Sequence, residues 1–305
     1  MSKYGLPYQG SKSTIANGIL ENLPECSNFY DLFGGGGAIS HAAALSGKWE
    51  QVHYNEIKSH ITQVFKDAIE GKYNYDVFKP KWITREEFFE KRDTDGYVST
   101  CWSFGNDGRN YLFGKKIEEY KKSLHNAVVF GEFDELSKEV LGRDSWDIEN
   151  ITERRRFLIK RIIEFRKNNT LPQSLYLYKF SSNKQLQQLQ QLQQLERLHL
   201  LNNPSLKNII TSSLDYREIE IQPNSIIYCD IPYEDTAGYR NVSFDKKAFL
   251  DWAANCPHPV YISEYNIDDD RFTCIYEVEK IALAGGSKEG KEKAIEKLYW
   301  NKRNL

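Results

Sequence analysis

The sequence of 305 residues lacks the long apolar runs and the leader segment that mark membrane and exported proteins. No stretch approaches the roughly eighteen uninterrupted apolar residues that a membrane-spanning helix needs. The N-terminus has no apolar segment followed by a small-residue cleavage site. These absences predict a cytoplasmic protein without a membrane partner.

Cysteine and histidine are sparse and scattered. The five cysteines are odd in number and include no Cys-x-x-Cys pair, which argues against a disulfide framework and against a zinc site. The six histidines show no pairing at metal-ligand spacing. We therefore expect no bound metal and interpret the cysteines as buried free thiols.

The chain also lacks a strong excess of charge of either sign, with a formal net charge of −2. Nucleic-acid binding depends on where the charge lies, and one basic run stands out. Arg154 and Arg155 begin this run and Lys160 follows, in a segment whose apolar residues leave room for a stripe at helical spacing. The pattern predicts a helix over residues 153–163 with a basic face, which either contacts phosphate or is simply solvated.

What is present is an ordinary globular composition, 40% apolar and 28% charged. Residues 1–70 and 206–305 contain alternating strand-like and helix-like segments, whereas residues 71–205 are richer in turns and aromatic residues. This arrangement favours an α/β domain interrupted by an inserted module. Strands are predicted at residues 28–33, 51–56, 209–210, 225–230, 260–263 and 273–276, and helices at residues 38–46 and 57–69.

A low-complexity tract of leucine and glutamine covers residues 185–198. Its leucines recur at every third residue. Because three residues advance an α-helix by about 300°, these leucines drift around the helix and form no single seam. We interpret the tract as a repeat expansion in a surface helix or linker, in preference to a partner-binding element.

Four consecutive glycines at residues 34–37 follow a predicted strand and open a predicted helix. Because glycine has no Cβ, such a turn lets the backbone approach a ligand at a helix N-terminus, although it can also serve strand–helix packing. About 20 residues further on, Glu56 ends the next predicted strand, where a carboxylate can bind the hydroxyls of a ribose. The combination predicts a site for a nucleoside cofactor.

A second polar strand end lies at Asp230. The apolar segment 225–229 stops at this residue and turns through Ile231 and Pro232 into Tyr233. Ligands of open α/β sheets bind outside the carboxyl ends of the strands. We therefore expect Asp230 to face a bound ligand.

These motifs resemble, in type and in order, those of the DNA adenine methylase family. Residues 230–233 resemble its catalytic Asp/Asn-Pro-Pro-Tyr/Phe tetrapeptide. Residues 31–37 resemble its Asp/Glu-Pro-Phe-x-Gly-x-Gly turn, and residues 55–56 resemble its Asn-Asp pair.

Three further segments fit the same family. Residues 4–12 look like its N-terminal cofactor motif, and Asp215 lies where an adenine-binding acidic residue is expected. Residues 102–111 resemble a loop of its recognition domain. Apart from this loop, the resemblance covers about the first seventy residues and the last hundred, outside the expected insert.

The resemblance implies a Rossmann-like S-adenosylmethionine-dependent methyltransferase sheet in residues 1–70 and 206–305. A mainly helical target-recognition domain would be inserted at residues 71–205. The implied reaction is transfer of the methyl group of S-adenosylmethionine to the exocyclic amino group of an adenine flipped out of double-stranded DNA.

The resemblance and the patterns above together assign the candidate residues to three roles. The expected catalytic residues are Asp230, Ile231, Pro232 and Tyr233. The expected cofactor-binding residues are Tyr8, Lys12, Asp31, Phe33, Gly34, Gly35, Gly37, Glu56, Asp215 and Asp230. The expected DNA-binding residues are Asn106, Arg109, Arg154, Arg155 and Lys160.

The sequence departs from the family pattern at Ile231, which replaces the first proline of the tetrapeptide. Isoleucine keeps a carbonyl acceptor but loses the fixed φ of proline. Two alternatives therefore stay open: a decayed methyltransferase that only binds DNA, and an amino-methyltransferase that acts on DNA cytosine. A nucleotide-hydrolase phosphate loop at residues 5–13 is disfavoured, because too few residues precede Gly5 to form a strand. The remaining expectations are a monomer and, in a restriction–modification system, a cognate restriction endonuclease as partner.

Overall fold

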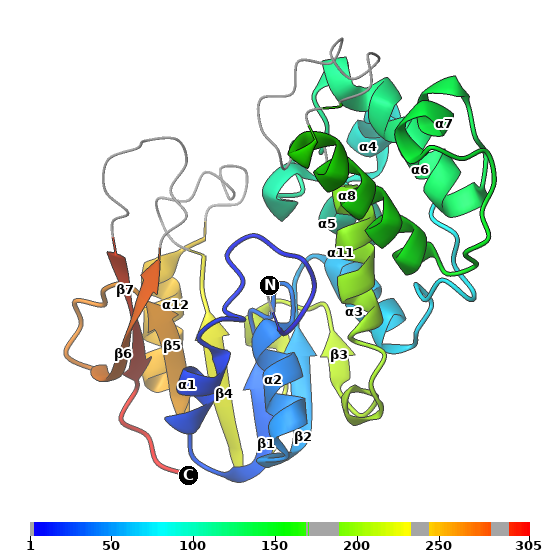
Figure 1. The fold of residues 1–305 in the computed structure, drawn as a ribbon. Helices are drawn as coiled ribbons and strands as arrows, with labels where there is room; N and C mark the ends of the chain where they lie inside the picture. The colour runs from blue at the N-terminus through cyan, green and yellow to red at the C-terminus, as the bar shows by residue number, and fades with distance from the viewer. Residues whose placement is uncertain (1–2, 169, 171–188, 233–243, 282–292) are drawn as a thin grey trace. The chain divides into compact units, whose positions relative to one another are not determined.

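The computed structural model describes residues 3–168, 170, 189–232, 244–281 and 293–305 (Figure 1). The chain divides into two compact units. The sheet unit combines Met1–Glu70 with Leu201–Leu305, and the helical unit is Gly71–Leu200. Tyr233 and residues 185–188 of the leucine–glutamine tract lie outside the described residues.

The sheet unit contains a mixed sheet with helices on its faces (Figure 1). Its elements in chain order are α1 (Ala16–Glu21), β1 (Cys26–Asp31), α2 (Ala38–Ser46), β2 (Trp49–Asn55), α3 (Ser59–Ile69), η3 (Pro204–Leu206), β3 (Ile210–Ser212), η4 (Tyr216–Glu218), β4 (Ser225–Asp230), α12 (Lys246–Asn255), β5 (Val260–Glu264), β6 (Thr273–Ile281) and β7 (Lys293–Trp300).

Seven strands form the sheet in the order β3-β2-β1-β4-β5-β7-β6. β7 is antiparallel to both of its neighbours, and the other pairings are parallel. The chain runs outward from β1 to β2 and β3, and then returns to the other side of β1 to form β4. This reversal creates a topological switch point between β1 and β4, where ligands of such sheets bind. The predicted α/β class with a Rossmann-like sheet is confirmed.

Alternation along the central strands supplies two apolar cores. Phe29 of β1 and Tyr228 of β4 face the core that includes residues of α1 and α2. Ile227 and Cys229 of β4 face the opposite core, where Phe249 of α12 packs. Because β4 is covered on both faces, its sequence is a nearly continuous apolar run that ends only at Asp230.

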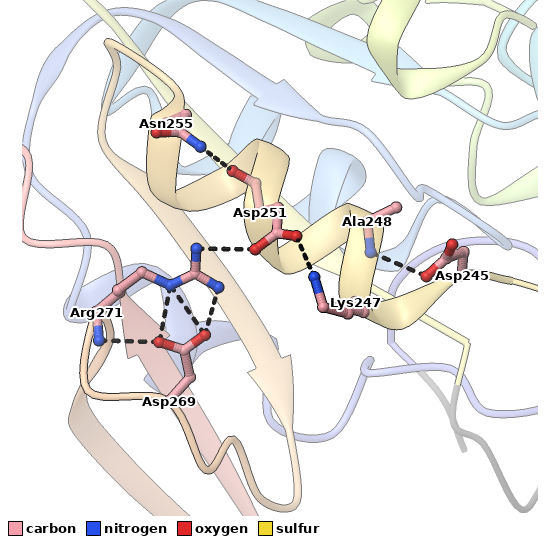
Figure 2. A network of polar contacts seen from close by, with 7 residues as sticks. All are labelled: Asp245, Lys247, Ala248, Asp251, Asn255, Asp269 and Arg271. Atoms are coloured by element: carbon pink, nitrogen blue, oxygen red, sulfur yellow. Dashed lines mark hydrogen bonds and ion pairs between the residues drawn. The ribbon is translucent and has the colours of Figure 1, made fainter.

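A surface network ties α12 to the segment that enters β6 (Figure 2). The Arg271 guanidinium donates to both oxygens of Asp269, and its Nη1 lies 2.9 Å from Oδ1 of Asp251 on α12. Lys247 lies 2.8 Å from the other oxygen of Asp251. Exposed ion pairs of this kind add little stability individually.

The helical unit contains no regular strand within its described residues. Its elements are α4 (Arg85–Lys91), α5 (Gly96–Cys101), η1 (Phe104–Asn106), η2 (Lys115–Ile117), α6 (Glu118–Phe130), α7 (Glu135–Leu141), α8 (Ile151–Lys167) and α11 (Gln190–His199). Its core gathers Tyr120 and Leu124 of α6, Leu158 of α8 and Leu192 of α11. The predicted basic helix at residues 153–163 therefore lies within α8.

The interpretation of the leucine–glutamine tract as a surface helix or linker is wrong for its described part. Leu189, Leu192, Leu195 and Leu198 are each at most 1% exposed. Successive leucines at spacing three step back by about 60°, so the three that lie within α11 (Leu192, Leu195 and Leu198) span an arc of about 120°. The drift that excludes a narrow seam is thus compatible with a helix that is buried over a wide arc of its surface.

The polar side of the tract is also built into the core of the helical unit. Gln191 is fully buried, and its Nε2 lies 3.1 Å from Nδ1 of His125. Nε2 of the same imidazole lies 2.9 Å from the Pro80 carbonyl oxygen. Burial lowers the pKa of His125 to about 4, so the ring is neutral near neutral pH.

The cysteines only partly match their predicted burial. Cys101, Cys229 and Cys256 are buried free thiols, whereas Cys26 is half-buried and Cys274 is exposed. In the described ranges, no helix is both long and apolar enough to cross a membrane. The same ranges contain no group of three or more histidine, cysteine or acidic side chains arranged to hold a metal ion.

Candidate active site

The polar ends of β1 and β4 meet at the switch point of the sheet. Asp31, the last residue of β1, pairs with Tyr228, and Asp230 lies two residues further along β4. Asp230 in turn pairs with Ser263 of β5. Sheet register therefore places Asp31 and Asp230 at the same edge, as strand ends in a parallel sheet must be.

The glycine turn after β1 has no room for side chains. A Cβ at Gly34 would overlap the ring of Tyr54, and one at Gly36 would meet Tyr8. Gly35 and Gly37 have positive φ values of 49° and 69°, which residues with a Cβ rarely adopt. The Tyr54 hydroxyl donates to the Gly35 carbonyl at 2.7 Å and fixes the turn. The four glycines therefore let the turn at the N-terminus of α2 pack closely against aromatic rings of the same unit.

Glu56 is held against this turn. Its carboxylate accepts from the backbone N–H groups of Gly35 and Lys58, each at 3.0 Å. The side chain is 6% exposed, and burial raises its pKa although both backbone donors oppose the shift. Glu56 therefore lies beside the glycine turn, as the motif spacing suggests.

Asp31 is a carboxylate with an unused oxygen. Ser40 of α2 donates to its Oδ2 at 2.7 Å, whereas Oδ1 is buried and has no hydrogen-bond partner among the described residues. Burial raises the pKa of Asp31 to about 7, although the Ser40 hydroxyl partly offsets this effect. A buried carboxylate oxygen without a hydrogen-bond partner can accept a hydrogen bond from a cationic group of a ligand.

The N-terminal segment is pinned to the glycine turn. The backbone N–H of Leu6 donates to the Gly36 carbonyl at 2.7 Å, and that of Gly5 donates to Nδ1 of His41 on α2 at 3.0 Å. A Cβ at Gly5 would collide with the Gly36 carbonyl oxygen. This docking brings Tyr8 onto the turn and leads the chain towards Lys12.

Lys12 and two carboxylates form a buried ionic group that we call the Lys12 cluster. The ammonium nitrogen lies 2.8 Å from Asp230 Oδ1 and 3.2 Å from Glu296 Oε1. The side chains of Lys12 and Glu296 are each 2% exposed, and that of Asp230 is 22% exposed. Burial disfavours the charged ammonium, but the two carboxylates outweigh it and raise the pKa of Lys12 above its usual value.

Glu296 is the residue of this cluster that the motifs do not indicate. It lies on β7, a strand missing from the predicted set. The sequence feature that could have indicated it is strand alternation. Glu296 lies two residues before Leu298 and so points to the same buried face of the strand, where an acidic residue is unusual.

Asn55 explains how the ends of β2 and β3 are held together. Its Nδ2 donates to the carbonyl groups of Leu32 and Leu214, and its Oδ1 accepts from the Leu214 N–H and the Ser212 hydroxyl. The motif comparison includes Asn55 but assigns it no role. Here it fixes the segment that leads to Asp215.

Three further candidates of the sheet unit make contacts outside the Lys12 cluster and the glycine turn. Phe33 packs against Tyr216 and Phe249, with ring centroids 5.4 and 5.5 Å apart. The Asp215 carboxylate caps η4 and binds Arg217. Ile231 is 1% exposed and belongs to the core beneath α12.

The candidates for DNA contact in the loop at residues 102–111 are held by local hydrogen bonds. Ser103 and Tyr111 form an isolated antiparallel bridge at the base of this loop. Asn106 has a φ of 58°, and its side chain donates to the Thr100 carbonyl at 2.8 Å. The backbone of Arg109 donates to Asp107 Oδ1 at 2.8 Å.

The basic residues of α8 divide into inward and outward groups. Arg155 is 9% exposed and binds both oxygens of Glu196 on α11, at 2.9 and 2.6 Å. Arg154 donates to the carbonyl groups of Ile148 and Val128. Lys160 is exposed. Arg155 therefore links two helices of the unit, and Lys160 is the member of the set that faces solvent.

Taken together, the sheet unit presents a close-packed glycine turn, a buried acceptor at Asp31, the Glu56 carboxylate beside the turn and a carboxylate at Asp230. Lys12 is occupied by the carboxylates of its cluster, which does not suit a phosphate-binding lysine. The arrangement can bind a cationic nucleoside and hold an N–H donor beside it.

Comparison with known families agrees with this geometry. The sequence matches the family model described as D12 class N6 adenine-specific DNA methyltransferase over residues 8–258. The matched range includes the glycine turn, Glu56 and Asp230 but not Glu296. No curated protein matches the chain.

Proposed function

The chain belongs to the family of D12 class N6 adenine-specific DNA methyltransferases, and from this premise we propose that its methyl donor is S-adenosylmethionine, bound at the carboxyl ends of β1 and β2. The activity itself, methylation of adenine in DNA by a transferase, follows from the family. The placement of Glu56 against the glycine turn, and of Asp31 and Asp230 at the same sheet edge, supports the donor and the residue roles.

The donors and acceptors of this site match the groups of S-adenosylmethionine. Glu56 would accept hydrogen bonds from the ribose hydroxyls. The unused Oδ1 of Asp31 would accept from the ammonium group of the methionine portion. Gly34, Gly35 and Gly37 would allow close backbone approach.

Other side chains complete the proposed cofactor site. Tyr8 and Phe33 would supply aromatic contact, and Asp215 would accept from the amino group of the cofactor's adenine. Lys12 would act at the boundary between the cofactor and the target base through its pairing with Asp230.

The chemical problem is the low nucleophilicity of the adenine amino nitrogen, whose lone pair is delocalised into the ring. S-adenosylmethionine, when bound, supplies the methyl group as an electrophile. The Asp230 carboxylate and the Ile231 carbonyl would accept the two N–H groups and so free the lone pair for attack. The amino nitrogen would gain the methyl group, the donor would be left as a neutral thioether, and the proton lost from the nitrogen would pass to water. Pro232 would shape the turn after these acceptors.

Access to this nitrogen requires an adenine outside the duplex. Flipping costs a few kcal/mol, which stacking and hydrogen bonds in the pocket must offset. Tyr233, outside the described residues, would supply the stacking. In the helical unit, Asn106, Arg109 and Lys160 would contact DNA.

Two arginines of α8 point into the helical unit, and their side chains already bind other groups of the protein. Arg154 and Arg155 are engaged by carbonyl groups and by Glu196, so their roles would be chiefly structural. A monomeric state, a cytoplasmic location and a cognate restriction endonuclease are proposals that rest on sequence alone.

The replacement of proline by Ile231 raised the alternative of a decayed enzyme that only binds DNA. Its side chain fills the core beneath α12, which gives this position a packing role that proline would fill less completely. The peptide carbonyl is retained by either residue. We therefore favour the active enzyme.

The direct test is methyl transfer by the purified chain. We expect label from S-adenosylmethionine to appear on adenine in double-stranded DNA, with sequencing of modified positions giving the recognised site. Label on cytosine would support the amino-methyltransferase alternative. DNA binding without transfer, in protein that also binds the donor, would support the decayed alternative.

Glu56→Gln tests the ribose assignment. The substitution keeps the shape but removes the charge and leaves a backbone N–H facing an amide donor. We expect binding of S-adenosylmethionine to weaken by about 1–3 kcal/mol, the scale for hydrogen bonds to a charged group. Calorimetric titration measures this change. The matched control is Glu50→Gln, an exposed position on the same strand; equal affinities in both variants would refute the assignment.

A further inference from the structure

The Lys12 cluster contains one cation and two carboxylates, drawn from three separate parts of the chain. Lys12 precedes α1, Asp230 ends β4, and Glu296 lies on β7. β7 is not adjacent to β4, because β5 lies between them in the sheet. The long lysine side chain therefore joins two carboxylates on strands that are not neighbours.

Stability alone is a weak explanation for this cluster. Removing three ionisable groups from water carries a desolvation cost, and apolar side chains of similar volume often stabilise a protein as well or better. Two carboxylates around one ammonium also leave an excess negative charge. The cluster reaches the solvent-accessible edge of the sheet only at Asp230, the most exposed of its members.

The second carboxylate, Glu296, changes the strength of Asp230 as a hydrogen-bond acceptor for a ligand. An aspartate paired with its own ammonium is partly neutralised and is a weaker hydrogen-bond acceptor. Glu296 shares the same ammonium, at 3.2 Å against 2.8 Å for Asp230. Sharing reduces the pull of Lys12 on Asp230 while still fixing the Asp230 carboxylate in position.

We propose that Glu296 is a positioning residue for methyl transfer, which holds Lys12 and thereby keeps the Asp230 carboxylate oriented and strong as an acceptor for the target amino group. The inference rests on the proposed role of Asp230. Glu296 touches Lys12 and acts through it.

A double-mutant cycle between Lys12 and Glu296 tests this mechanism. Single-turnover assays compare four proteins: wild type, Glu296→Gln, Lys12→Met and the double variant. The substrates are labelled S-adenosylmethionine and unmethylated duplex DNA that contains the recognised site. A parallel burst experiment with DNA and donor in excess gives the fraction of active protein, and the single-turnover rate constant at saturating enzyme does not depend on that fraction. The matched control is Glu277→Gln on β6, an exposed carboxylate that binds Lys297.

We expect Glu296→Gln to lower the rate constant about tenfold, with dissociation constants for donor and DNA nearly unchanged. Lys12→Met leaves two carboxylates without their cation, and we expect a larger loss. Adding Glu296→Gln to Lys12→Met should then restore part of the rate, because the repulsion between the carboxylates is removed. Glu277→Gln should match wild type.

Three results would overturn the inference. An unchanged rate constant in Glu296→Gln would do so, as would effects of the two substitutions that simply multiply. A loss confined to amplitude or melting temperature would show a purely structural role. If Asp230→Asn abolishes transfer while Glu296→Gln does not slow it, this inference alone fails; if Asp230→Asn retains full activity, the proposed role of Asp230 fails as well.

Discussion

Asp230→Ala should abolish methyl transfer while leaving the donor bound. The carboxylate is proposed to accept an N–H of the target amino group in the transition state, and groups of this kind are worth orders of magnitude in rate. We expect the single-turnover rate constant to fall at least about a thousandfold, which corresponds to roughly 4 kcal/mol. Donor affinity should fall much less, because Asp31 and Glu56 remain.

The isosteric variant Asp230→Asn separates charge from shape. It keeps one carbonyl acceptor but replaces the other oxygen with a donor and removes the ion pair with Lys12. We expect it to lose nearly as much activity. Asp251→Asn, in the surface network on α12 (Figure 2), is the matched control and should transfer methyl groups at the wild-type rate. Comparable rates in Asp230→Ala and wild type would remove Asp230 from the mechanism.

The second large effect concerns α11. Leu192→Ala and Leu195→Ala should each destabilise the helical unit by about 3 kcal/mol, because both side chains are completely buried and their removal leaves cavities. Together the losses come to about 6 kcal/mol, which is comparable to the lower end of the stability of a typical domain, roughly 5–15 kcal/mol. We expect the double variant to be largely unfolded in this unit, as measured by circular dichroism and denaturant titration.

Leu200→Ala provides the comparison for α11. Leu200 follows the same helix but is 61% exposed, so its truncation should change the free energy of unfolding little. If the double variant unfolded at the same denaturant concentration as Leu200→Ala, the packing of the leucine–glutamine tract described above would be refuted.

The parts of the fold that could be predicted are those where local pattern and tertiary environment agree. The predicted helix at residues 38–46 coincides with α2, because Gly37 and Gly47 adopt left-handed conformations at its two ends. The predicted strand at residues 225–230 coincides with β4, since burial on both faces requires an apolar run. Both signals are local and can be read from neighbouring residues.

The strand β7 and the packing of α11 could not be predicted in this way. β7 places Glu296 at a buried position, which a pattern based on apolar alternation counts against a strand. For α11, the same spacing of leucines fits an exposed helix and a helix enclosed over a wide arc. Only the positions of α5, α6 and α8 decide between them.

For the candidate site, motif order indicates which residues belong together but not their pairings. The association of Glu56 with the Gly35 N–H follows the spacing of the motif. The contact between Lys12 and Glu296 joins positions 284 residues apart in sequence, and no local pattern specifies such a pair. Its source is the antiparallel insertion of β7 between β5 and β6.

The pairing of β1 with β4 has a consequence for how the chain is made. Asn28 faces Ser225 across these strands, so almost 200 residues separate them in sequence. At about 5–20 residues per second, a ribosome needs roughly 10–40 s to make the intervening segment. During that time β1 lacks its inner neighbour and presents an open strand edge. The helical unit is continuous in sequence and can fold first, so nascent-chain chaperones should be needed chiefly for the N-terminal seventy residues.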